Sequence, residues 1–130
     1  MTELVITKDD LDDENFYKEE SLTYEGTIRI STELGYVKFK KSISAKLSII
    51  AEAGSGIKAG EGIEAGSGIK AGSGIKAGFS IRCINSLSFK LRAFAGLCDW
   101  RLPTDLESEI ECASIDGGGA VALGKLKLKQ

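Results

Sequence analysis

The chain has 130 residues and a formal net charge of −2, from 17 basic and 19 acidic side chains. This length predicts one domain, and the near balance of charge gives no whole-molecule field that would attract nucleic acid or an anionic membrane. The three cysteines, Cys83, Cys98 and Cys112, are far apart and odd in number, which argues for a reducing compartment and against a structural zinc site. With no signal peptide and no apolar run long enough to span a bilayer, a cytoplasmic protein is expected.

Residues 1–21 are expected to form an N-terminal cap that carries a short strand and a helical turn over residues 9–18. The segment is rich in acidic side chains, namely Asp9, Asp10, Asp12, Asp13, Glu14, Glu19 and Glu20. A solvated, frayed terminus is the simplest interpretation of such a run. The alternative is an acidic face that mimics nucleic acid and blocks a basic groove.

From Ile57 to Cys83 the sequence repeats every six residues, as IKAGEG IEAGSG IKAGSG IKAGFS IRC. The first and third residues of each repeat alternate with a charged residue, so both are expected to face inward. The predicted core residues are Ile57, Ala59, Ile63, Ala65, Ile69, Ala71, Ile75, Ala77, Ile81 and Cys83. Glycine then turns the chain, which we attribute to its access to positive φ. One short strand and one corner per six residues predict a β-solenoid.

Weaker apolar pairs at i and i+2 extend the pattern, so residues 22–95 are predicted to form one continuous solenoid. The pairs are Leu22/Tyr24, Ile28/Ile30, Leu34/Tyr36, Val37/Phe39, Ile43/Ala45 and Ile49/Ala51, then Leu87/Phe89 and Ala93/Ala95. The spacing widens after Ile49, which predicts a bulge or loop at residues 52–55. The fold class is therefore all-β, a single-stranded hexapeptide-repeat β-helix with an N-terminal cap and a short C-terminal β tail.

The period leaves the number of sides of the coil open. In a three-sided coil, residues three repeats apart stack, so Glu64 lies beside Arg82 and Lys58 lies beside Lys76. In a two-sided coil, residues two repeats apart stack, and Glu64 lies beside Lys76. We favour a three-sided, left-handed coil, which is usual for hexapeptide solenoids.

Residues 96–130 depart from the period and are expected to form a C-terminal cap or tail. Alternating segments at residues 107–112 and 120–128 flank three glycines, which predicts a β-hairpin. Such a tail can fold back on its own barrel end or on that of another copy. A homodimer or higher homo-oligomer is therefore expected.

The chain contains no histidine, which removes the chemistry most common on this coil. Hexapeptide acyltransferases use a histidine base, solenoid carbonic anhydrases bind their metal through histidines, and a serine or cysteine nucleophile normally needs such a base. We therefore expect no enzyme, no cofactor and no metal. Direct nucleic-acid binding is also not expected, because Glu61 and Glu64 interrupt the lysines of the repeat.

Phe79, Trp100 and Arg101 are the candidate partner-binding residues, because the predicted core does not explain them. Phe79 stands where other repeats have Ser or Glu, so it is expected to project from a corner. The alternatives are that Phe79 packs against the cap or tail and that Trp100 plugs the barrel end rather than forming a binding hot spot.

The Ile-Lys/Glu-Ala-Gly hexapeptides resemble the β-helical core of bactofilins, bacterial cytoskeletal proteins that polymerise end to end, and this resemblance covers about residues 22–95. Bactofilins have disordered tails, whereas this tail carries Trp and Cys. A second resemblance covers about residues 50–115. The stretches KAGFSIRC, FAGLCDWR and IEC are similar to small proteins of bacterial phages and mobile elements, in which IEAG/IKAG repeats precede an FAG-x-x-x-W-R segment.

The second resemblance implies an accessory role on a mobile element, where small proteins include anti-CRISPR and other anti-defence inhibitors. The expected function is a non-enzymatic binding protein that inhibits a host defence complex through protein–protein contact. The alternative is a bactofilin-like, self-assembling structural scaffold.

Overall fold

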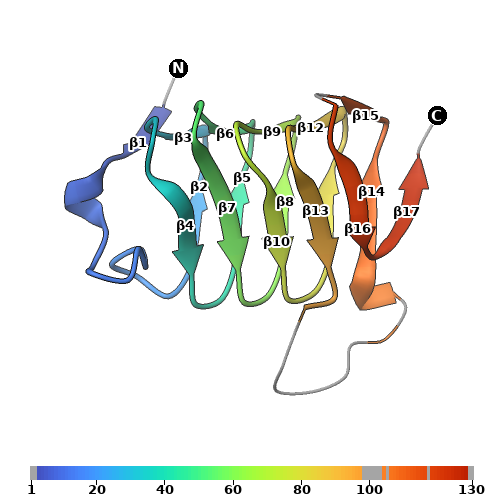
Figure 1. The fold of residues 1–130 in the computed structure, drawn as a ribbon, viewed down its shortest axis with the longest axis horizontal. Helices are drawn as coiled ribbons and strands as arrows, with labels where there is room; N and C mark the ends of the chain where they lie inside the picture. The colour runs from blue at the N-terminus through green and yellow to red at the C-terminus, as the bar shows by residue number, and fades with distance from the viewer. Residues whose placement is uncertain (1–2, 98–103, 105, 117, 129–130) are drawn as a thin grey trace.

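The computed structural model describes residues 3–97, 104, 106–116 and 118–128. Within them the chain forms short strands and two single-turn 3₁₀ helices, η1 (Lys8–Asp10) and η2 (Leu106–Ser108), and winds into a β-solenoid (Figure 1). The predicted all-β, single-stranded β-helix is confirmed. In the described part of the chain, no helix has the length and hydropathy needed to cross a bilayer.

Three parallel sheets form the three sides of the coil. The first sheet contains β1 (Glu3–Ile6), β3 (Thr27–Ile30), β6 (Ile49–Ala51), β9 (Ile69–Ala71), β12 (Ser86–Phe89) and β15 (Ser114–Asp116). The second contains β4 (Gly35–Phe39), β7 (Ser55–Ala59), β10 (Ile75–Ala77), β13 (Arg92–Ala95) and β16 (Ala120–Leu123). The third contains β2 (Leu22–Tyr24), β5 (Ile43–Ala45), β8 (Ile63–Ala65), β11 (Ile81–Cys83), β14 (Glu109–Cys112) and β17 (Lys125–Leu128).

The register of the regular repeats decides the number of sides. Ile57 pairs with Ile75, and Glu64 pairs with Arg82, so residues three repeats apart are neighbours. The three-sided coil is therefore correct and the two-sided alternative is excluded.

The handedness differs from the expectation. In Figure 1 the strands of the second sheet run downward at the front, those of the third sheet run upward behind them, and the chain advances from left to right. This path is a right-handed coil, so the expected left-handed coil is wrong. Right-twisted strands make about 98% of crossovers between parallel strands of one sheet right-handed, and each turn of this coil is such a crossover.

The interior is filled by the inward residues of the repeat. The ten residues that the period places inward, from Ile57 to Cys83, are all at most 4% exposed. Phe39 on β4 and Phe89 on β12 are also fully buried. Because each buried isoleucine contributes about 1.5–3 kcal/mol, the stacked isoleucine columns are the main stabilising element of the fold.

The repeat glycines serve a different purpose from the one expected. None of Gly60, Gly66, Gly72 and Gly78 has positive φ. A Cβ atom on any of them would instead lie 1.9–2.3 Å from a backbone carbonyl oxygen of the preceding coil. The corners require glycine because neighbouring coils approach closely there, and not because of positive φ.

The N-terminal segment closes one end of the coil. Strand β1 joins the first sheet beside β3, and the expected helical turn is the single turn of η1. Further along, Tyr17 N–H donates to the Lys38 carbonyl at 2.8 Å, and Lys38 N–H donates to the Asn15 carbonyl at 2.9 Å. The Tyr17 ring lies 5.4 Å from the Phe39 ring, between centroids, and Tyr17 is 7% exposed. The segment thus covers the outer edge of β4 and the end of the core.

The C-terminal strands do not form the expected hairpin. Strands β14, β15, β16 and β17 pair in parallel with β11, β12, β13 and β14, respectively. They continue the coil because their apolar residues extend its inward columns, as Ile110 does above Ile81. A glycine turn suits a corner of the coil as well as a hairpin, and stacking on the preceding coil favours the corner.

Candidate interaction site

Three lysines are aligned on the outer face of the second sheet. Lys38, Lys58 and Lys76 are in register on β4, β7 and β10, so neighbours are separated by the inter-strand spacing of about 4.8 Å. We call these three residues the lysine row. Together with Lys40 and Phe16 they line a hollow with a volume of 460 Å³.

Aromatic rings hold the ammonium groups of this face. Lys76 Nζ lies 4.6 Å from the ring centroid of Tyr36 and 5.6 Å from that of Phe94. Lys38 Nζ lies 5.3 Å from the Phe16 centroid, and Lys40 Nζ lies 5.8 Å from it. Each such contact is worth about 0.5–1 kcal/mol at an exposed site. The rings therefore order cations that would otherwise move freely in solvent.

Within the described part of the chain, the lysine row has no carboxylate partner. The ion pairs within 4.0 Å among these residues involve Lys18, Arg29, Lys41 and Lys127, and none involves the row. Asp12 interacts electrostatically with Lys40 and Lys38. Hydrogen bonds from the N–H groups of Phe16 and Glu14 lower its pKa, with smaller contributions from Lys40 and Lys38. Positive charge therefore dominates this face of the described structure.

The two acidic residues expected to interrupt the lysines lie elsewhere. Glu64 is on β8 in the third sheet, in register with Arg82. A carboxylate oxygen of Glu61 accepts a hydrogen bond from the Ser42 hydroxyl at 3.3 Å, at a corner. The three-sided coil places Glu64 on another side than the lysines, as the predicted neighbour Arg82 implies, so the expected interruption of the lysines is wrong.

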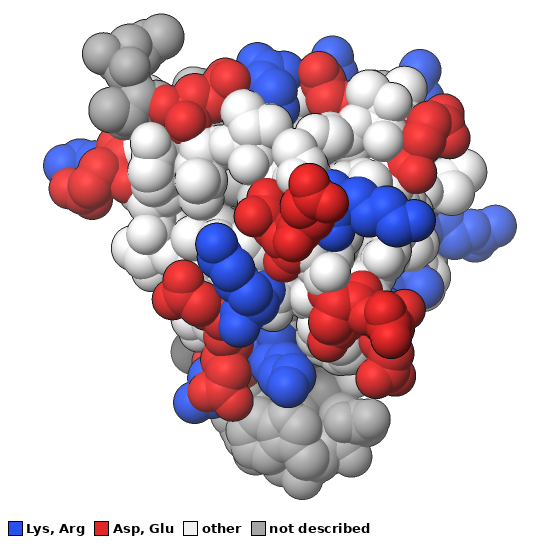
Figure 2. All heavy atoms as spheres, turned by 90° about the vertical axis from the view of Figure 1, so that its left-hand side faces the viewer, with Lys and Arg blue, Asp and Glu red and all other residues white. Residues whose placement is uncertain are grey.

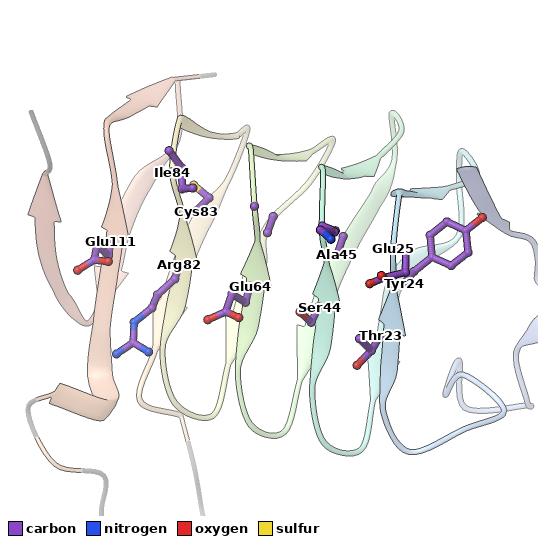
Figure 3. A pocket seen from close by; sticks show the side chains of 13 residues that line it. Thr23, Tyr24, Glu25, Ser44, Ala45, Glu64, Arg82, Cys83, Ile84 and Glu111 are labelled. Carbon is purple, nitrogen blue, oxygen red and sulfur yellow. The ribbon is translucent and has the colours of Figure 1, made fainter. Parts of the chain in front are cut away.

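A second hollow, also of 460 Å³, lies on the third sheet (Figure 3). Its floor carries Thr23, Ser44, Glu64, Arg82 and Glu111, which come from five successive strands. Charges of both signs alternate here, so this face presents no uniform field.

Two buried thiols lie on the inner side of the same sheet. Burial raises the pKa of Cys83 to about 12 and also raises the pKa of Cys112. The Cys83 thiol contacts the carbonyls of Asn85 and Ser86 at 3.8 and 3.6 Å. Because the thiolate is the nucleophilic form, these cysteines act as small apolar core residues.

The structure places one of the three predicted site residues. Phe79 is half-buried at the corner after β10 and lines a shallow hollow with Glu61 and Arg82. Trp100 and Arg101 lie outside the described residues. The three-sided coil predicts that Lys58 lies beside Lys76, and the register confirms this pair. Lys38 was not predicted as the third member, because the coil that separates it from Lys58 is longer than three regular repeats. The apolar pair Leu34/Tyr36 predicts that Tyr36 faces inward; this prediction is wrong, because the Tyr36 ring contacts Lys76 on the outer face.

No family model, curated protein or solved structure matches the chain. Among the described residues, no group of three or more Cys, Asp and Glu side chains is arranged to hold a metal ion.

Proposed function

We propose that the chain is a non-enzymatic binding protein whose lysine row contacts an acidic surface of a partner protein. The role that fits the sequence resemblance is an accessory protein of a phage or mobile element that inhibits a host defence protein in the manner of an anti-CRISPR. The observation that carries the proposal is the row itself, three in-register cations without an acidic partner among the described residues.

The row is well suited to recognition because it is built on a rigid surface. β7 and β10 have a strand on each side, and the backbone of Asn15 and Tyr17 hydrogen-bonds the outer edge of β4 at Lys38. Rings also hold two of the three ammonium groups. Less side-chain freedom is therefore lost on binding. A concentrated patch of one sign accelerates association with a complementary patch and disfavours basic partners.

The test compares two variants of equal charge in pull-downs from a bacterial host lysate. The row variant is Lys38→Glu, Lys58→Glu and Lys76→Glu. The control variant is Lys46→Glu, Lys70→Glu and Lys90→Glu, three exposed lysines that are not in the row. Both changes take the formal charge from −2 to −8, since each of three substitutions contributes −2. We expect the wild type and the control to retain the same protein and the row variant to lose it. Equal retention by both variants would contradict the proposal.

A self-assembling scaffold is the second candidate function, and the strand edges of the C-terminal coil, which no described strand pairs with, favour it. An end-to-end polymer of the bactofilin kind also needs an open N-terminal end. Here the backbone of Asn15 and Tyr17 occupies the outer edge of β4, so a limited assembly fits the chain better than an open filament. Sedimentation over a concentration series separates the two.

A further inference from the structure

Among the described residues, no strand covers the C-terminal end of the coil, on the right of Figure 1. Strands β15, β16 and β17 are the last of the three sheets, and within the described residues no strand pairs with their outer edges. Leu126 and Leu128 are in register with Ile110 and Cys112 and so continue the inward columns. Ile110 and Cys112 are fully buried, yet Leu126 is 42% and Leu128 is 55% exposed. The hydrophobic core therefore reaches solvent at this end.

At the N-terminal end of the coil, in contrast, the hydrophobic core is covered. There Leu22, the first member of the same inward column, is 8% exposed, and Tyr17 covers the core beside Phe39. Figure 2 views this end and shows many acidic and basic side chains on its surface. One end of the solenoid thus has a polar cap, as terminal repeats require, whereas the described residues provide none at the other.

We propose that the C-terminal coil is a self-association surface, on which the C-terminal coil of a second copy docks to form a closed, two-fold dimer. Unpaired strand edges present rows of N–H and C=O groups that pair with other strand edges. Three edges set at the angles of a triangular coil are matched by another triangular coil end. β1 and β2 are also last in their sheets, but the backbone of residues 15–17 covers β4 at the N-terminal end. The exposed leucines favour the C-terminal end of the second copy, because Leu22 is buried at the other end whereas Leu126 and Leu128 are exposed.

Two-fold symmetry is also consistent with the directions of the edge strands and with the positions of the exposed leucines. A two-fold axis perpendicular to the coil reverses the strands of the second copy, so edges meet in antiparallel fashion, which joins strands without a crossover. The same operation brings Leu126 and Leu128 of one copy against the apolar end of the other. Because the contact uses the same patch on both copies, it closes at two and leaves no further open end.

Size-exclusion chromatography with light scattering over a wide concentration series tests the dimer. The expected mass is twice the 13.8 kDa of one chain. Leu126→Lys with Leu128→Lys is expected to give the single-chain mass, whereas Lys125→Gln with Lys127→Gln, outward on the same strand, is expected to keep the dimer. A wild-type monomer at every concentration, or growth into polymers, would overturn the proposal. Far-UV circular dichroism of the leucine variant checks that it remains folded.

Cross-linking gives a readout that does not depend on disrupting the strand. In a Cys98→Ser background, Lys127→Cys places a thiol at the proposed interface and Glu20→Cys places one at the capped end. We expect oxidation to link two Lys127→Cys chains and to leave Glu20→Cys chains monomeric. Linkage between a Lys127→Cys chain and a Glu20→Cys chain would show a head-to-tail contact and overturn the closed dimer. Neither experiment involves the lysine row, so the proposed function can fail independently.

Discussion

At the scale of single residues, Ser55 shows how the irregular coils are kept in place. It is fully buried at the start of β7. Its hydroxyl oxygen accepts a hydrogen bond from the N–H of Leu34 at 3.0 Å, and the hydroxyl donates to the carbonyl of Ser31. One side chain therefore joins the turn at positions 31–34 to the loop at positions 52–55, where the coil is longer than three regular repeats.

Ser55→Ala is expected to lower the free energy of unfolding by about 1–3 kcal/mol, because it leaves a buried N–H and a carbonyl without their partner. Urea denaturation followed by circular dichroism measures the change. The control is Ser67→Ala, whose hydroxyl makes an exposed hydrogen bond with Asn85 and is expected to change stability by no more than about 0.5 kcal/mol. Similar losses in both variants would show that Ser55 is not a structural link.

The irregular coil also explains where the sequence correctly predicts which side chains face inward and where it does not. Between Ile57 and Cys83 the period is strict, so the alternation of inward and outward residues follows directly. Before it, residues 31–34 add an irregular number of positions, and a slip of one residue reverses every side chain of a strand. For this reason the predicted inward orientation of Tyr36 is wrong, and the contact of its ring with Lys76 on the outer face was not expected. The loop geometry depends on Ser55, which is distant in sequence from its partner Leu34.

At the scale of elements, the two glycines of the corner at positions 60–62 have different requirements. A Cβ at Gly60 would lie 2.3 Å from the Lys40 carbonyl oxygen, whereas one at Gly62 would lie 3.6 Å from that of Ser80. Neither glycine has positive φ. In this corner the first position is therefore restricted by space and the second is not, and the period places the second glycine where Ser80 stands. At Gly74 the second position is also restricted, because a Cβ there would lie 2.8 Å from the Arg92 carbonyl oxygen.

Gly60→Ala is expected to cost about 1–3 kcal/mol, because a methyl group inserted against backbone forces adjacent coils apart. Gly62→Ala is expected to be neutral or to stabilise by about 0.4–1 kcal/mol, since it restricts the unfolded chain without a clash. Thermal and urea unfolding of the two variants provide the comparison. If Gly62→Ala were the more harmful change, conformational freedom rather than space would control the corner.

The C-terminal strands show why local turn signals are ambiguous in such a chain. The glycines at positions 117–119 suit a hairpin, and nothing nearby in the sequence distinguishes a hairpin from a corner. The choice depends on contacts with the preceding coil, where Leu126 stacks on Ile110 and Ile110 on Ile81. The alternation of apolar and polar residues therefore predicts where the strands lie, but it does not predict which strands pair.

At the scale of the whole molecule, the solenoid is a stack in which each coil contacts only its neighbours. The stability of such a protein is approximately a sum over coils and their interfaces. The candidate site has the same origin, since its lysines come from three successive coils. The sequence therefore permits coils to be removed in whole units, provided that the phase of the repeats is kept.

Deletion of residues 57–74 removes one full coil and joins Gly56 to Ile75. In the shortened chain Ile75 takes the place of Ile57 beside Val37, and Lys76 takes that of Lys58 beside Lys38, because the paired residues share one register. We expect a folded protein with a cooperative transition. Its urea m-value should fall by roughly a fifth to a sixth, since m follows the surface exposed on unfolding and each sheet has five or six strands.

Deletion of residues 57–65 is the matched control, because it removes half a coil and puts the following repeats out of phase. Isoleucine and alanine would then meet corners of the preceding coil, and glycines would meet its strands. This variant is expected to lose cooperative unfolding and far-UV strand signal, although it removes less of the chain. If both deletions behaved alike, stacking of equivalent side chains in adjacent coils would not be what holds the solenoid together. Retention of the fold by the full-coil deletion alone would establish the coil as the unit of stability.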